Sequence, residues 1–181
     1  SRKVSYIHKI FNQLFYGPKL YKEIFNEKSQ FNDEPLIDLD DIVLDNNLMS
    51  KLKNRFGTKI STVTGRGKFA FSYSMKNFLE KFDIESSVFL EDRPLELAKP
   101  NPESLIESIS KINSKCSLYI GDSMEDLLMV QKCQEQGYDV SFCGIYGSSD
   151  EPELKYELFQ KNKASFILES IQELPKALNL V

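Results

Sequence analysis

The sequence predicts an α/β protein: a Rossmann-like three-layer core with a parallel sheet, plus a small helical cap. From Thr58 onward, short β-rich runs alternate with segments of helical periodicity, as in βαβ units. Residues 1–45 instead show helical spacing without strand-like runs. The 181 residues, of which 41% are apolar, are enough for one core and a small accessory lobe.

Residues 1–45 are expected to form a portion of the helical cap and its linker. Apolar residues recur at helical spacing in two groups, separated by a break around Tyr16-Gly17-Pro18. A polar stretch, 26–35, then leads toward the α/β part. The two groups comprise Ile7, Ile10, Phe11, Leu14 and Phe15, and then Leu20, Tyr21, Ile24 and Phe25.

Residues 46–181 are expected to form the Rossmann-like core, beginning with a helix over 46–56. The helix over 101–112 has Asn101 as a predicted N-cap and Pro102 at its first position, and Gly137 closes the helix that begins at 124. Strands are predicted over 58–63, 86–90, 116–121, 139–147 and 164–168, and helices over 69–82, 101–112, 124–137, 151–161 and 170–178.

Composition argues against several classes of protein. The net charge of −4 implies no basic face, so nucleic acid is not an expected partner. Apolar runs fall short of the ~20 residues that span a bilayer, and the first residues lack a signal-peptide pattern, so no membrane partner is expected. The three cysteines lack metal-binding spacing, which predicts buried reduced thiols in a cytoplasmic protein.

Three polar motifs follow predicted strands. They are Thr64-Gly65-Arg66, Lys99 within 98–102, and Asp122 with Asp126 in "GDSMED". Each has a structural alternative: Thr64 as a helix cap, Lys99 as a solvated side chain, and the aspartates as an N-cap and a first-turn acid. Because ligands of parallel α/β sheets gather at the C-terminal strand ends, the three motifs together predict a single site.

Asp122 and Asp126 are four residues apart, at the predicted start of a helix. Two carboxylates this close repel each other unless a cation lies between them. Oxygen ligands from one or two carboxylates suit Mg²⁺, which keeps several of its waters. The pair therefore predicts a Mg²⁺ site.

The order of these motifs resembles that of the haloacid-dehalogenase-like hydrolase superfamily, in its phosphoglycolate-phosphatase-like subfamily with an early helical cap. The resemblance runs from about Phe15 to Leu178, and "KPNPESLIESI…SLYIGDSMEDLLM" is its most specific part. It implies Mg²⁺-dependent phosphoryl transfer, mostly hydrolysis of small phosphomonoesters. It also implies that Thr64, with Gly65 and Arg66, binds the phosphoryl group and that Lys99 neutralises it. Asp122 would bind Mg²⁺ directly, and Asp126 would hold its water shell or a neighbouring ligand.

The resemblance also calls for a D-x-D strand, whose first Asp is the nucleophile and whose second is the acid and base. Asp38 and Asp40 have this spacing, but only two apolar residues precede Asp38, and Asp41 stands where the family usually has Gly. We therefore expect the segment that forms this strand to precede Ser1 in the chain. In the folded sheet it would lie between the Thr64 strand and the Asp122 strand. Besides an upstream strand and the Asp38/Asp40 pair, the third interpretation is that the protein has lost the nucleophile. Without that strand, two strand edges would be left unpaired.

We accordingly expect a cytoplasmic phosphatase that hydrolyses a small phosphorylated metabolite through an aspartyl-phosphate. The rival hypothesis is a regulatory module that binds phosphate or Mg²⁺ but has lost the nucleophile. A dehalogenase on the same scaffold is disfavoured by the paired aspartates, because dehalogenases need no metal. The aromatic residues of segment 6–25 could line a substrate pocket, form a homodimer contact, or pack as an ordinary amphipathic helix.

Overall fold

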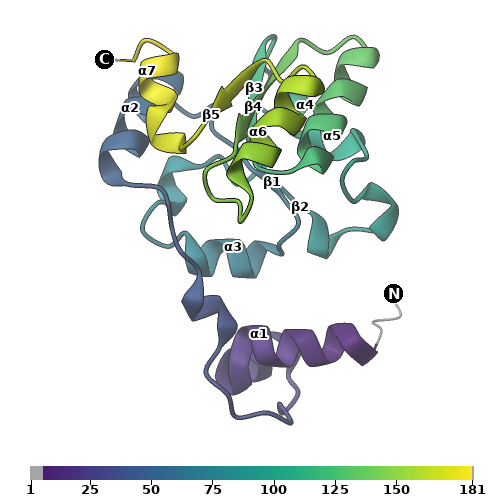
Figure 1. Cartoon of the computed structure of the whole chain (residues 1–181). Helices are drawn as coiled ribbons and strands as arrows, with labels where there is room; N and C mark the ends of the chain where they lie inside the picture. The colour runs from purple at the N-terminus through teal and green to yellow at the C-terminus, as the bar shows by residue number, and fades with distance from the viewer. Residues whose placement is uncertain (1–5, 181) are drawn as a thin grey trace. The chain divides into compact units, whose positions relative to one another are not determined.

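The structure, a computed structural model, describes residues 6–180 (Figure 1). The first five residues of the predicted cap portion and Val181 thus lie outside the described residues. The chain divides into two compact units: Ser1–Ile42 with Phe69–Lys76, and Val43–Lys68 with Asn77–Val181. The sequence predicts a single boundary at 45/46, whereas in the structure the first unit ends at Ile42 and also includes Phe69–Lys76.

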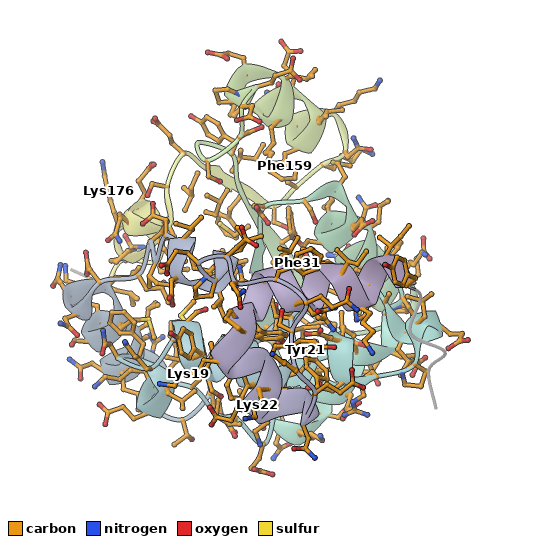
Figure 2. The ribbon with its side chains drawn as sticks, turned by 90° about the horizontal axis from the view of Figure 1, so that it is seen from below. Lys19, Tyr21, Lys22, Phe31, Phe159 and Lys176 are labelled. Carbon is orange, nitrogen blue, oxygen red and sulfur yellow. The ribbon has the colours of Figure 1, made fainter. Side chains whose placement is uncertain are left out.

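The first unit is helical. Helix α1 (Tyr6–Phe25) contains the predicted break, because Gly17 has φ 65° and ψ 173°. A Cβ atom at Gly17 would lie 2.9 Å from Pro35 Cβ, so both backbone angle and space favour glycine there. In Figure 2, Tyr21 marks the buried side of α1, whereas Lys19 and Lys22 are exposed. The core of this unit comprises Tyr16, Tyr21, Ile37 and Ala70.

Leu36–Leu39 forms a short 3-10 helix, η1. Asp38 therefore lies within a helical turn, and it does not follow a strand. Its Oδ1 accepts a hydrogen bond from the Tyr73 hydroxyl at 2.8 Å, and Asp40 Oδ2 accepts one from Ser74 Oγ at 2.6 Å. Both aspartates thus have partners within the first unit, in α3 (Lys68–Ser74).

The second unit contains five parallel strands in two sheets, which confirms the α/β, Rossmann-like prediction. Helices α4, α5 and α6 form one layer, and α2 and α7 lie on the other side of the strands (Figure 1). The strands are β1 (Val63–Thr64), β2 (Val88–Phe89), β3 (Ser117–Gly121), β4 (Val140–Ile145) and β5 (Phe166–Leu168). The helices are α2 (Asn46–Phe56), α4 (Glu103–Lys111), α5 (Met124–Glu135), α6 (Pro152–Lys161) and α7 (Leu174–Ala177). Shorter 3-10 turns are η2 (Leu79–Lys81), η3 (Leu90–Asp92), η4 (Leu95–Leu97) and η5 (Ile171–Glu173).

The strands pair as β1-β2 and as β3-β4-β5. Within residues 6–180, no ladder joins β1 to β3. All five residues of β3 are half-buried, whereas four of the six residues of β4, which is paired on both sides, are buried. β3 therefore has the exposure of a strand that is covered on one edge only.

Most elements are shorter than predicted, among them β2, which covers Val88–Phe89 of the predicted 86–90. The helix expected over 69–82 ends at Ser74, because 69–76 and 77–82 belong to different units and their apolar residues have different cores. The strand expected over 58–63 is reduced to Val63–Thr64, since its ladder comes from β2 alone in the part of the chain that the structure describes.

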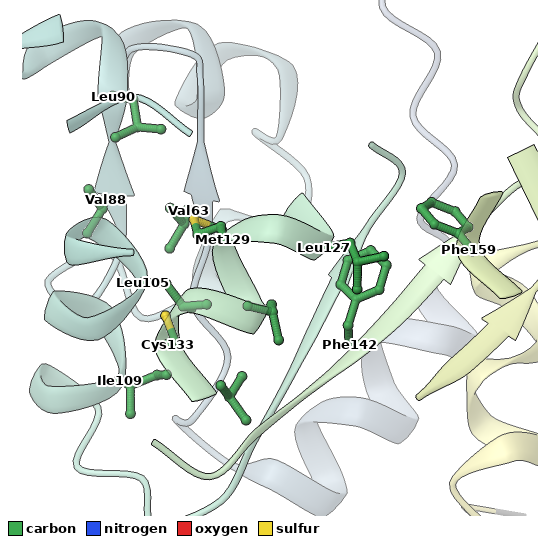
Figure 3. Packing of buried hydrophobic residues seen from close by; sticks show 12 residues of the cluster. Val63, Val88, Leu90, Leu105, Ile109, Leu127, Met129, Cys133, Phe142 and Phe159 are labelled. Carbon is green, nitrogen blue, oxygen red and sulfur yellow. The ribbon is translucent and has the colours of Figure 1, made fainter. Parts of the chain in front are cut away.

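The core of the second unit lies between β1–β4 and the layer of α4, α5 and α6 (Figure 3). Phe142 contacts Phe159 edge-on at 5.5 Å between ring centroids, and it stacks on Tyr119 at 6.5 Å. Cys133 and Cys143 are buried as predicted, but Cys116 is exposed, because it precedes β3 and lies outside the paired strand. No helix in segment 6–180 is both long and apolar enough to cross a bilayer.

Candidate active site

Asp126 lies at the centre of a hydrogen-bonded cluster at the C-terminal end of β3. Its side chain is only 4% exposed. One oxygen, Oδ1, accepts from Lys99 Nζ at 2.7 Å and from the Tyr119 hydroxyl at 3.1 Å. The other, Oδ2, accepts from the backbone N–H and the hydroxyl of Ser123, at 3.2 and 2.8 Å. Four protein donors therefore compensate the buried charge of one carboxylate.

The start of α5 fixes the direction of Asp126. Ser123 is the N-cap, and its Oγ accepts from the Asp126 N–H at 3.2 Å, so the two residues form a capping box. Gly121 permits the close approach, because a Cβ there would lie 2.6 Å from Asp126 Oδ2. The sequence Gly-Asp-Ser-x-x-Asp thus folds Asp126 back against the end of β3.

Lys99 reaches this cluster from the segment before α4. Its side chain is 18% exposed, and Nζ lies 5.6 Å from the centroid of the Tyr119 ring. The solvated-lysine alternative therefore does not describe this structure. An ammonium has three hydrogens, so the bond to Asp126 leaves two N–H groups for a ligand.

Thr64 lies at the end of β1, half-buried. Its Oγ1 accepts from the Arg66 N–H at 3.3 Å, which leaves the hydroxyl hydrogen available to donate. The first N–H groups of α3 are bound instead by Glu91 and Asp92, each at 2.8 Å from the Gly67 and Lys68 amides respectively. Thr64 is therefore not the cap of α3.

Tyr119 connects the two sheets. Its hydroxyl lies 3.0 Å from the carbonyl oxygen of Val63, next to Thr64, and 3.1 Å from Asp126 Oδ1. Burial raises the pKa of Tyr119, and the negative charges of Asp126 and Asp122 raise it further, so the phenol stays protonated and remains a donor. The contacts thus run from β1 through Tyr119 and Asp126 to Lys99.

Asp122 follows β3 directly and is exposed. Among the described residues, no three His, Cys, Asp or Glu side chains converge on a common point. Asp122 offers a carboxylate toward solvent, whereas the oxygens of Asp126 are engaged by protein donors. A hard cation such as Mg²⁺ fits Asp122 as one ligand, with water and ligand oxygens completing its coordination.

The structure thus links Lys99 and Asp126 directly, and links them to the end of β1 through Tyr119. Sequence reasoning missed Tyr119 and Ser123. The pattern Ser123-x-x-Asp126 is a capping-box signal and could have identified Ser123. No sequence pattern singled out Tyr119, because its role depends on a contact between its hydroxyl and the Val63 carbonyl, which belongs to a distant segment of the chain.

No family model matches the chain, and no curated protein does. Two solved structures resemble it. One, an X-ray structure of a Northeast Structural Genomics Consortium target, is 21% identical with a TM-score of 0.75, covering 96% of this chain and 52% of the other. The second, assigned as a haloacid dehalogenase-like hydrolase from Bacteroides fragilis, is 23% identical with a TM-score of 0.55, covering 71% and 56%.

At these identities the likeness establishes the fold alone. The chain therefore shares the α/β fold of these two solved structures. It spans about half the length of both solved chains.

Proposed function

We propose that the full-length protein is a Mg²⁺-dependent phosphatase that hydrolyses a small phosphomonoester. The observation that supports it best is the Lys99 ammonium, held at 2.7 Å by a buried carboxylate beside the ends of two parallel strands. A lysine held in this way presents two further N–H donors to an anion. A phosphoryl group, whose charge increases on its equatorial oxygens during transfer, is an anion that such a site favours.

The residues divide the binding of the phosphoryl group between them. Lys99 neutralises its charge, and the Thr64 hydroxyl donates to one of its oxygens. Gly65 and Arg66 follow Thr64 on an exposed loop, where their backbone and side chain can contact the substrate. In this proposal Asp126 does not touch the substrate, because its oxygens already hold Lys99 and the start of α5.

Asp122 would hold Mg²⁺ as a direct ligand. The ion supplies a charge that stabilises the transferring phosphoryl oxygens and orients the substrate. Asp126 would act on the metal only through neighbouring groups, since Lys99, Tyr119 and Ser123 occupy its carboxylate.

We further propose that a parallel strand carrying the nucleophile fills the gap between β1 and β3. Thr62 uses its carbonyl to pair with Val88 in β2, so the neighbouring Val63 carbonyl faces the opposite edge of β1. That carbonyl lies 3.0 Å from the Tyr119 hydroxyl and pairs with no strand amide among the described residues. The half-buried residues of β3 agree with an edge that such a strand would cover.

The inserted strand would come from residues upstream of Ser1, and its first Asp would form the aspartyl-phosphate. Asp38 and Asp40 are poor alternatives, because Asp38 lies in the 3-10 helix η1 and both carboxylates accept hydrogen bonds within the first unit. The helical first unit would act as the cap that selects the substrate, with phosphoglycolate-like compounds as the first to test. The three free cysteines agree with a reducing compartment such as the cytoplasm.

The test is hydrolysis of p-nitrophenyl phosphate by the full-length protein. We expect turnover with Mg²⁺, loss of turnover on chelation, and at least a hundredfold loss in Asp122→Ala, in the range that removal of one charge-stabilising group costs. Asp150→Ala replaces another exposed aspartate and should retain wild-type activity. Activity that survives chelation or Asp122→Ala contradicts the proposal. Phosphate binding without turnover would support the regulatory module instead.

A further inference from the structure

We propose that Tyr119 is a positioning residue for Lys99, an inference that rests on the phosphatase proposed above. The Tyr119 hydroxyl and Lys99 Nζ both donate to the same oxygen, Asp126 Oδ1, at 3.1 and 2.7 Å. The Tyr119 ring also lies 5.6 Å from Nζ, within cation–π range. Tyr119 thus contacts both members of the ion pair.

Lys99 needs such help because of its flexible side chain. A lysine ammonium sits on a four-carbon stem and takes one position only where its partners are fixed. Ser123 fixes Oδ2 of Asp126, which leaves rotation of the carboxylate to be restrained at Oδ1. The Tyr119 hydroxyl supplies that restraint.

Tyr119 itself is held rigidly. Its ring stacks on Phe142, which is 1% exposed and packs against Phe159. The hydroxyl also lies 3.0 Å from the Val63 carbonyl, so it is placed between β1 and the start of α5. The core therefore fixes the position of the phenol oxygen within reach of both acceptors, and through Asp126 it helps to fix where Lys99 lies.

The hydroxyl has one hydrogen and two acceptors. A carboxylate is the stronger acceptor of the two, because its charge strengthens the bond. If a strand amide in the gap between β1 and β3 pairs with Val63, the hydrogen is left to Asp126 alone. Insertion of that strand would then hold Lys99 more firmly. Completion of the sheet would thus be coupled to the affinity of the site for an anion.

The test uses Tyr119→Phe, which removes the hydroxyl and keeps the ring, in the full-length protein. The readout is the NMR signal of the Lys99 ammonium, assigned by its absence in Lys99→Met. A firmly hydrogen-bonded ammonium exchanges slowly and gives a signal near neutral pH. We expect the signal in wild type and its loss in Tyr119→Phe, with inorganic phosphate binding about tenfold more weakly.

Tyr138→Phe is the matched control, because Tyr138 packs against the same core. It should leave both the signal and phosphate affinity unchanged. An unchanged Lys99 signal and phosphate affinity in folded Tyr119→Phe would overturn the proposal, as would the absence of the signal in wild type. A third outcome separates the two proposals. If Tyr119→Phe loses the Lys99 signal but the full-length protein does not hydrolyse aryl phosphate, the positioning role is supported and the phosphatase is refuted.

Discussion

At the residue scale, the hydrogen bonds of Asp126 explain how its carboxylate can carry a charge although it is buried. A buried charge is tolerated when hydrogen bonds compensate it, and here Lys99, Tyr119 and Ser123 together supply four. The compensation has a consequence for function: these donors occupy both oxygens of Asp126. Of the pair, the exposed Asp122 therefore has the carboxylate that is better placed for the Mg²⁺ we propose.

Gly121 tests this packing. We expect Gly121→Ala to destabilise the protein by about 1–3 kcal/mol, because the new methyl group would overlap the Asp126 carboxylate, with a Cβ–Oδ2 distance of 2.6 Å. The measurement is urea unfolding. Gly65→Ala is the control, since a Cβ at Gly65 meets no atom within 4 Å. A loss in Gly121→Ala no larger than that of the control would show that Asp126 is not packed as described.

The same scale shows what the sequence could predict about the site. The sequence predicts Thr64, Lys99, Asp122 and Asp126 as site residues because each follows a predicted strand or precedes a helix in the chain. Tyr119 was not, because a tyrosine in an apolar run is indistinguishable from a core residue. Its hydroxyl matters only through Val63, which is 56 residues away in the sequence.

At the element scale, local signals predicted most boundaries well. The helix predicted from 101 begins at Glu103 with Pro102 as its N-cap, so the predicted N-cap at Asn101 is wrong by one residue, although the Asn101 side chain accepts from the Glu103 N–H at 2.9 Å. The exceptions have a tertiary cause. The periodicity over 69–82 spans two units, and β1 is short because β2 alone pairs with it in the described residues. Neither cause is visible in a local window of sequence.

The thiols of α5 and β4 give a pH prediction. Burial raises the pKa of Cys133 and Cys143 from 9.0 to about 11 each. Between pH 9 and 11 the unfolded chain loses thiol protons that the folded chain keeps, so stability is full below pH 9 and falls as pH rises. Denaturant unfolding at pH 8–10.5 should show a steeper fall in wild type than in a Cys133→Ala/Cys143→Ala variant. Equal slopes would contradict the buried, protonated thiols.

At the scale of the whole molecule, the proposed function depends most on the division of the strands into two sheets, with no ladder between β1 and β3 in residues 6–180. The parallel strands and helical layers confirm the predicted Rossmann-like class, and the solved relatives share that fold. Pattern and turn chemistry could predict this much because they act locally. The interruption between β1 and β3, bridged by Tyr119, depends on pairing between distant segments.

The most direct test of the central claim is a crystal structure of the full-length protein grown with Mg²⁺ and inorganic phosphate. We expect phosphate oxygens at hydrogen-bond distance, about 2.7–3.2 Å, from Lys99 Nζ and Thr64 Oγ1, with Mg²⁺ on the Asp122 carboxylate. Phosphate and metal bound elsewhere, with Lys99 and Thr64 turned away from them, would contradict it.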